Sequence, residues 1–68
     1  MKNTDLVINN NAKIGDALKL LEINTKGFIL VEDDSRVIIG VITDGDIRRN
    51  ILKGGKIEDN VMSCVNSD

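Results

Sequence analysis

Apolar and polar residues alternate in blocks along the chain, and the spacing within each block predicts the element that it forms. Leu6-Val7-Ile8 is a short apolar run closed by three asparagines, which is typical of a short strand. From residue 14 onward, apolar side chains recur with the spacing of one helix face, and charged side chains fall outside it. The apolar residues are Ile14, Ala17, Leu18 and Leu21. This pattern predicts a helix that ends near Asn24.

The start of this predicted helix carries a weak capping signal. Helix starts favour Ser, Thr, Asp or Asn just before the first turn. Lys13 stands at that position, and Gly15 falls in the first turn. Asn11 is the nearest alternative cap, so the local sequence does not fix where the helix begins.

Two more apolar runs follow, on either side of a polar segment. They are Phe28–Val31 and Val37–Ile42, with Glu32–Arg36 between them. Apolar β-branched runs joined by a short polar segment predict a β-hairpin. Because both runs are apolar at consecutive positions, we expect both faces of the sheet to be covered. The helices of this chain can cover one face, and the other face needs a partner.

A second helix is predicted directly after the hairpin. Apolar residues recur with helical spacing within Asp44–Lys53, and Gly54-Gly55 ends the helix. Beyond it the chain forms a looser tail, in which one helical turn is expected at Glu58–Met62. The order strand, helix, strand, strand, helix predicts an α/β (α+β) fold, with a small three-stranded sheet and two helices on one face.

The cysteine and histidine content limits what can stabilise so small a chain. The 68 residues form one small domain at most, and such domains bury a modest share of their surface. With one cysteine and no histidine, neither an internal disulfide nor the usual zinc ligand sets are available. A partner subunit is the support that remains. Cys64 is therefore interpreted as a structural or incidental thiol.

The charge pattern excludes some partners. The net charge of −2 comes from 9 basic and 11 acidic residues spread along the chain, and Phe28 is the single aromatic residue. We expect no nucleic-acid partner, because a cationic surface and stacking platforms are both missing. We expect no membrane partner either, since the apolar runs are too short to span one. One cysteine and an N-terminus without a long apolar core fit a cytoplasmic protein.

The segment Gly40–Arg49, GVITDGDIRR, carries the strongest candidate chemistry. Thr43 directly follows a predicted strand, and Asp46 stands three residues later. This is the spacing of a capping box, in which the hydroxyl and the carboxylate each accept the backbone N–H of the other residue. In this interpretation the segment is a strand that runs into a capped helix and binds nothing.

A binding interpretation uses the same geometry. A helix start offers unpaired N–H groups and a positive dipole end to a phosphate. A carboxylate there can accept hydrogen bonds from the adjacent hydroxyls of a ribose, and Arg48 and Arg49 can meet an anionic tail. The two interpretations are compatible, since the same residues can cap an empty site and bind a ligand when it arrives.

The remaining acidic residues do not suggest catalysis or a metal. Glu32-Asp33-Asp34, and Asp44 with Asp46, lack the alternating oxygen ligands and distal glutamate of a calcium loop, so no metal site is expected. No nucleophile stands with a base in the sequence pattern. We therefore expect that the chain is not an enzyme.

Four segments resemble the cystathionine β-synthase (CBS) domain. GVITDGDI is similar to its pattern of a glycine, apolar strand residues, Thr or Ser, two variable residues, Asp, and Ile or Leu. AKIGDALKLL resembles the family's first helix, GFILVEDDSRVIIGVIT its hairpin, and KGGKIEDNVMS the segment leading toward a second motif. The resemblance covers about residues 6–62. It identifies the chain, residues 1–68, as a single CBS motif, which we expect to be a fragment of a longer protein.

The resemblance implies a regulatory module. CBS motifs occur as tandem pairs that bind AMP, ADP, ATP or S-adenosylmethionine between them and modulate an attached enzyme, with no other cofactor required. It places a ribose at Thr43 and Asp46. Phosphate contacts vary within the family, and Arg48 and Arg49 are our candidates for them. The base would lie against apolar residues, for which the candidates are Ile8, Ile14 and Phe28 or Ile29. The partner is a second CBS motif, in cis or through homodimerisation.

The parent protein and the alternative role also follow from this resemblance. TDGDIRR is similar to CBS regions attached to sugar-phosphate nucleotidyltransferases and sugar-phosphate isomerases. Asn9-Asn10-Asn11 replaces a loop in which proline is common, and Lys13 stands where threonine is more usual; both departures concern the base pocket. The alternative function is a structural association module without a small-molecule ligand, which the apolar content of so short a chain also favours.

Overall fold

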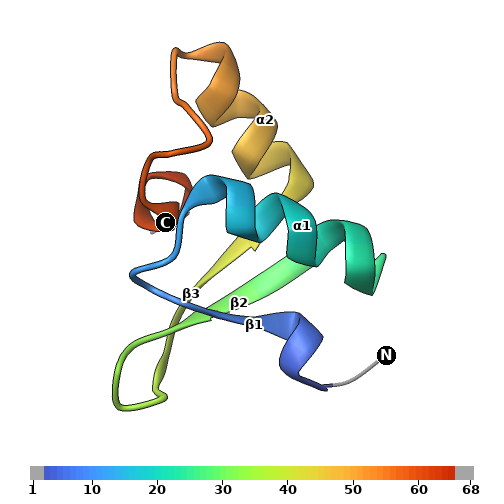
Figure 1. Ribbon diagram of the computed structural model, residues 1–68, viewed down its shortest axis with the longest axis vertical. Coiled ribbons are helices and arrows are strands. Elements are labelled where there is room, and N and C mark those ends of the chain that lie inside the picture. Colours follow the sequence, from blue (N-terminus) through green and yellow to red (C-terminus); the bar gives the residue numbers. More distant parts are fainter. Residues whose placement is uncertain (1–2, 66–68) are drawn as a thin grey trace.

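The structure, a computed structural model, describes residues 3–65 and confirms the predicted order of elements (Figure 1). Two short 3-10 helices, which flank this core order, were not predicted as such. The elements are η1 (Asn3–Leu6), β1 (Val7–Asn9), α1 (Ile14–Asn24), β2 (Phe28–Glu32), β3 (Ile38–Thr43), α2 (Asp44–Leu52) and η2 (Val61–Cys64).

The three strands form one mixed sheet in the order β1-β2-β3. β1 runs parallel to β2, so α1 is the crossover between them, and β2 and β3 form the predicted antiparallel hairpin. Ile29 pairs with Ile42 across the hairpin, and both side chains are fully buried. Because side chains alternate between the faces of a sheet, this pair marks the face that the helices cover.

The hydrophobic core lies between that face of the sheet and both helices, as expected. The sheet, α1, α2 and η2 all contribute buried side chains to one hydrophobic cluster. This confirms the two-layer arrangement with both helices on one face of the sheet. The buried residues are Ile14, Ala17 and Leu21 from α1, Ile29, Val31 and Ile42 from the sheet, Ile47 from α2, and Val61 and Cys64 from η2.

The opposite face of the sheet is apolar and open to solvent within the described chain. Val7, Leu30 and Val41 pair side by side across the three strands, and Val41 is exposed. Phe28, opposite Thr43 on the same face, is also exposed. We call this surface, made by Val7, Phe28, Leu30, Ile39 and Val41, the open sheet face. The helices therefore cover one face of the sheet, and the apolar side chains on the other face stay partly or fully exposed.

The start of α1, which the local sequence left open between Lys13 and Asn11, depends on contacts with a distant part of the chain. Lys13 is the N-cap residue, and its backbone N–H donates to the Asp16 carboxylate at 3.1 Å. The next two N–H groups are satisfied from a distant part of the chain. Ile14 N–H donates to the Asp59 carbonyl and Gly15 N–H to the Ile57 carbonyl, each at 2.9 Å. No local capping residue is needed, because backbone carbonyls from beyond α2 take that role.

In the tail beyond α2, the helical turn lies at Val61–Cys64 instead of the predicted Glu58–Met62. Asn60 sets this start, because its Oδ1 accepts the Met62 N–H at 2.7 Å. Its Nδ2 also donates to the Asn10 carbonyl, and the Val61 N–H donates to the Ala12 carbonyl. Figure 1 shows η2 beside the start of α1, so the tail holds the loop that leads into α1.

The end of α1 is fixed by Asn24, a buried polar side chain with 2% exposure. Its Nδ2 donates to the Asp5 carbonyl at 2.8 Å and to the Phe28 carbonyl at 3.3 Å, and its Oδ1 accepts the Lys26 N–H at 2.8 Å. One amide thus joins η1, the end of α1 and the first residue of β2. These hydrogen bonds offset the free-energy cost of burying the polar amide.

Asn24→Ala should therefore lower the free energy of unfolding by about 1–3 kcal/mol, since it removes the three hydrogen bonds of a buried amide. Chemical denaturation followed by circular dichroism measures this loss. Asn11→Ala, at an exposed asparagine in the loop before α1, is the matched control and should change stability by less than about 0.5 kcal/mol. Equal losses in the two variants would contradict the role assigned to Asn24.

Candidate functional site

The capping box at the start of α2 is present as predicted. Thr43, the last residue of β3, has an extended backbone, and its Oγ1 accepts the Asp46 N–H at 3.1 Å. The Asp46 Oδ2 in turn accepts the Thr43 N–H at 2.9 Å. The strand therefore turns directly into the helix, and the two side chains are fixed at the junction by reciprocal hydrogen bonds.

The Asp46 carboxylate is largely buried and accepts hydrogen bonds from two residues. The side chain of Asp46 is 9% exposed, and its Oδ1 accepts a hydrogen bond from Arg49 Nη2 at 2.6 Å. Burial by itself raises the pKa of Asp46, but hydrogen bonds from Thr43 and the Arg49 guanidinium outweigh this and hold the pKa below its usual value. The carboxylate is thus held ionised at neutral pH.

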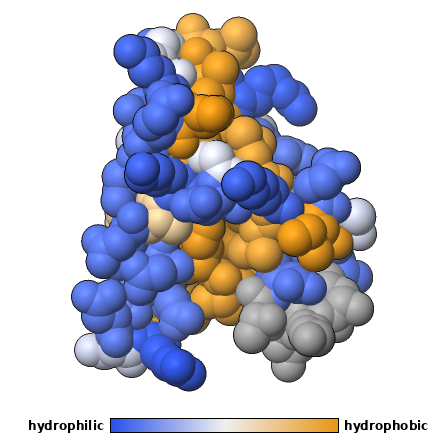
Figure 2. Space-filling view, viewed as in Figure 1, coloured by the Kyte–Doolittle hydropathy of each residue, from blue (hydrophilic) through white to orange (hydrophobic). Residues whose placement is uncertain are grey.

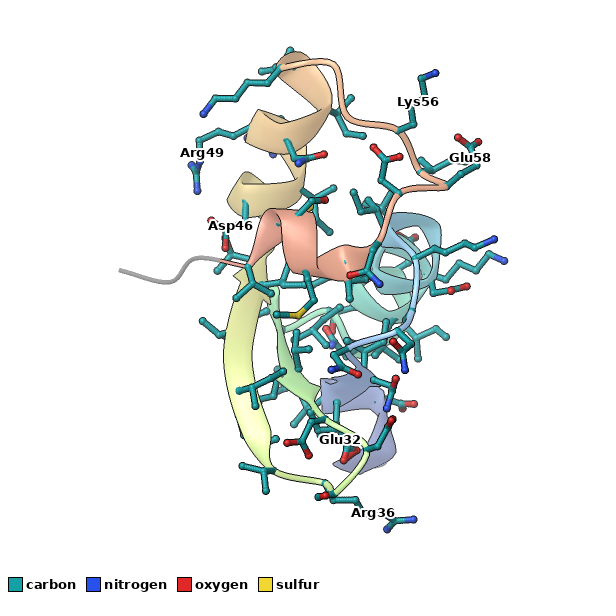
Figure 3. The ribbon with its side chains drawn as sticks, turned by 90° about the vertical axis from the view of Figure 1, so that its left-hand side faces the viewer. Glu32, Arg36, Asp46, Arg49, Lys56 and Glu58 are labelled. Atoms are coloured by element: carbon teal, nitrogen blue, oxygen red, sulfur yellow. The ribbon has the colours of Figure 1, made fainter. Side chains whose placement is uncertain are left out.

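A pocket of about 280 Å³ opens beside this carboxylate, between α2 and η2. We call it the Asp46 pocket. Figure 3 shows Asp46 and Arg49 on the same flank of α2, away from Lys56 and Glu58 in the segment after the helix. The lining residues are Asp46, Arg49, Asn50, Lys53, Ser63 and Cys64.

Lys53, Asn50 and the η2 residues of this pocket were not among the predicted site residues. The α2 members could have been found, because Asp46, Asn50 and Lys53 follow at intervals of four and three residues and so lie on one helix face. Nothing in the local sequence links η2 to Asp46, since that approach depends on how the tail folds back.

The two adjacent arginines lie on different flanks of α2. Successive residues of an α-helix point about 100° apart, so only one of them can face the Asp46 pocket. Arg48 lines a second, mainly apolar pocket of about 290 Å³ beside α1, together with Asp44, Leu18, Ile47, Ile51 and Leu52. Apolar atoms gather over the upper part of the molecule, where α2 lies (Figure 2). The structure brings Arg49, and not Arg48, to Asp46.

The apolar site candidates are not brought to the Asp46 pocket. Ile14 and Ile29 are fully buried in the core, and Ile8 packs against it. Phe28 lies on the open sheet face, directly opposite Thr43. Of the four, Phe28 alone presents an exposed side chain next to a predicted ribose contact.

Other kinds of site find little support in residues 3–65. Within this range no group of three or more His, Cys, Asp or Glu side chains is placed to hold a metal ion. Burial raises the pKa of the Cys64 thiol, which disfavours the reactive thiolate. None of the described helices is long and apolar enough to cross a membrane.

Comparisons with known proteins place this geometry in a family. The CBS domain model matches residues 1–53. An uncharacterized protein of Methanocaldococcus jannaschii is 37% identical over 60 residues, which are 88% of this chain and 20% of that protein. The arabinose 5-phosphate isomerase GutQ of Escherichia coli is 41% identical over 46 residues, which are 68% of this chain and 14% of the isomerase.

A solved structure shares the fold. The CBS domain protein of Pyrobaculum aerophilum, complexed with AMP, superposes with a TM-score of 0.85 at 19% identity over 98% of this chain and 53% of that one. The chain belongs to the CBS domain family, which confirms the resemblance. It spans about a fifth or less of the curated relatives and about half of the solved chain.

Asp46→Ala should lower the free energy of unfolding at pH 7 by about 1 kcal/mol, because the capping box loses its carboxylate. Since the pKa of Asp46 is lowered in the folded state, this stabilisation is present above the unfolded pKa of about 4. It is lost as the pH falls through the lower folded value. Denaturant titrations at several pH values compare wild type with the variant.

Asp44→Ala is the control for this prediction. Asp44 is also an acid in the first turn of α2, but it is exposed and does not accept the Thr43 N–H. Its loss should reflect only the helix dipole, about 0.3–1 kcal/mol. If the difference between wild type and Asp46→Ala did not shrink in acid, the assigned role of the carboxylate would be wrong.

Proposed function

We propose that this CBS domain is a regulatory module that binds an adenosine nucleotide, AMP, ADP or ATP, or S-adenosylmethionine, and modulates an attached enzyme. The observation that carries the proposal is the ionised, largely buried Asp46 carboxylate, held between the Thr43 capping bonds and Arg49 at the edge of a pocket. The AMP complex of the structurally similar Pyrobaculum aerophilum protein supports the ligand class.

The ribose is proposed to bind at Asp46 and Thr43. A carboxylate offers about four acceptor positions, and the described chain uses two of them, one for the Thr43 N–H and one for Arg49. Two remain for a pair of ribose hydroxyls without loss of the helix cap. The Thr43 hydroxyl accepts the Asp46 N–H and keeps its own proton for donation. Capping and binding are therefore compatible in this geometry.

The phosphate of the nucleotide is proposed to bind the guanidinium of Arg49. This guanidinium lies beside the Asp46 carboxylate but is 63% exposed, so most of its donors face solvent. A phosphate next to a bound ribose can accept those donors without disrupting the ion pair. Arg48 stays a weaker candidate, because it lines the pocket on the opposite flank of α2.

The base site needs a second motif. At about 280 Å³ the Asp46 pocket is slightly smaller than typical small-molecule sites of about 300–1,000 Å³. Of the apolar candidates, Phe28 is exposed and adjacent to Thr43, whereas Ile8, Ile14 and Ile29 lie in or against the core. We propose that a second CBS motif, in cis or from another copy of the chain, covers the open sheet face and encloses the base there.

The attached enzyme is proposed to act on a sugar phosphate. The supporting observation is the 41% identity to part of an arabinose 5-phosphate isomerase. A second candidate function is association without a ligand, which the open sheet face favours because it supplies an apolar surface whether or not a nucleotide binds.

The first test is calorimetric titration of the chain with AMP, ADP, ATP and S-adenosylmethionine, at concentrations where it self-associates. Saturable binding to wild type should disappear in Asp46→Ala, because the ribose loses its acceptor, and should persist in the control Asp44→Ala. A folded chain that binds none of the four ligands, or an Asp46→Ala variant with unchanged affinity, would refute the nucleotide site.

The open sheet face predicts self-association in the isolated chain. Val41→Asp should weaken it at least about tenfold, since a charge would be buried at the centre of the interface. Sedimentation velocity over a concentration series measures the effect. Ile23→Asp, at a 62% exposed apolar position on α1, is the control and should leave association unchanged. A wild-type chain that remains monomeric at high concentration would contradict the proposal.

A further inference from the structure

We infer that Lys53 makes the Asp46 pocket selective for ligands that carry several phosphates, over adenosine and over cationic S-adenosylmethionine. The inference rests on the proposed nucleotide site and narrows its ligand class. Lys53 stands at the C-cap of α2, where a lysine also complements the helix dipole. A role in dipole compensation alone predicts a stability effect and no ligand preference, so the two roles can be separated.

The charges that line the pocket favour an anion. They are the carboxylate of Asp46 and the cations of Arg49 and Lys53. Arg49 is paired with Asp46, and among residues 3–65 no carboxylate forms an ion pair with Lys53. One positive charge at the pocket is therefore uncompensated. S-adenosylmethionine carries a net positive charge, because its sulfonium and ammonium outnumber its carboxylate, so this cation repels it.

The spacing along α2 matches a ribose followed by a chain of phosphates. Arg49 is about one turn and Lys53 about two turns beyond Asp46, which corresponds to about 5 and 10 Å along the helix axis. A ribose at Asp46 brings its first phosphate to Arg49 and later phosphates toward Lys53. Lys53 thus acts on the second and third phosphates, and Arg49 on the first.

Burial also falls in this order along the pocket. The Asp46 side chain is 9% exposed, the Arg49 side chain is 63% exposed, and Lys53 is exposed. A nucleotide therefore binds with its ribose hydroxyls at the less exposed end, beside Asp46, and its phosphates at the solvent-exposed end. Because exposed charges are screened by salt, the preference for added phosphates should weaken as ionic strength rises.

The test is calorimetric titration of the full chain with adenosine, AMP, ADP, ATP and S-adenosylmethionine, in wild type and Lys53→Gln. In wild type the affinity should rise from adenosine to ADP and ATP, and S-adenosylmethionine should bind more weakly than AMP. Lys53→Gln should weaken ADP and ATP about two- to five-fold, the range expected for one exposed charge pair. Adenosine should bind the variant as it binds wild type.

Lys56→Gln is the matched control, because Lys56 follows α2 but points away from the Asp46–Arg49 flank (Figure 3). Its nucleotide affinities should equal those of wild type. Pyrophosphate, titrated while backbone amide shifts of α2 are recorded, probes the phosphate end without a ribose. It should shift the amides near Lys53 in wild type and not in Lys53→Gln.

The outcomes separate the two proposals. If adenosine and ATP bind equally, or Lys53→Gln weakens adenosine and ATP alike, the charge selection is refuted while the nucleotide site stands. If no nucleoside or nucleotide binds the folded chain, the proposed function fails. Absence of a pyrophosphate shift in wild type would then refute the phosphate role of Lys53 as well.

Discussion

The reciprocal hydrogen bonds between Thr43 and Asp46 fix the junction on which the site depends. They join the last residue of β3 to the first turn of α2 with no loop between them. Because this junction sets where α2 begins, it also sets which residues of α2 face η2 and which face α1. The same two bonds that stabilise the helix thereby bring Arg49 beside the carboxylate and send Arg48 to the other flank.

The hydrophobic core of this domain lies on one face of the sheet only. The helices cover one face of the sheet completely, with Ile29, Val31 and Ile42 inaccessible to solvent, whereas the other face remains apolar and exposed. Small domains have little apolar burial to offset the entropy of folding. A partner that covered the open sheet face would bury more apolar surface and so stabilise the domain. The proposed ligand site lies at the border of that face. Partner and ligand would stabilise the same edge of the molecule.

Much of the fold followed from local patterns. The spacing of Ile14, Ala17 and Leu21 predicted α1 and an end near Asn24, and the polar segment Glu32–Arg36 predicted the hairpin. Thr43 and Asp46 predicted the capping box, since all of its atoms belong to residues within one helical turn. Geometry of this kind is set by residues that are close in the sequence, so it can be predicted from the sequence pattern.

The errors lie where distant segments meet. Lys13 looked unsuited to begin a helix, because the carbonyls of Asp59 and Ile57 that accept the next two N–H groups, those of Ile14 and Gly15, are more than forty residues away. Lys53 was not among the predicted site residues, although its spacing from Asp46 places it on the pocket side of α2. The pocket wall from η2 and the burial of Ile14 and Ile29 depend on tertiary packing, which a residue pattern cannot supply.

The carbonyls that satisfy the start of α1 also have a consequence for synthesis. An eleven-residue helix is marginal in water on its own, and the residues that complete its first turn are translated only after the whole sheet and α2. The nascent chain therefore contains the whole hairpin before the carbonyls of Ile57 and Asp59, which accept the first N–H groups of α1, have been made. Until residues 57–59 have been added, the first N–H groups of α1 can bond only to water.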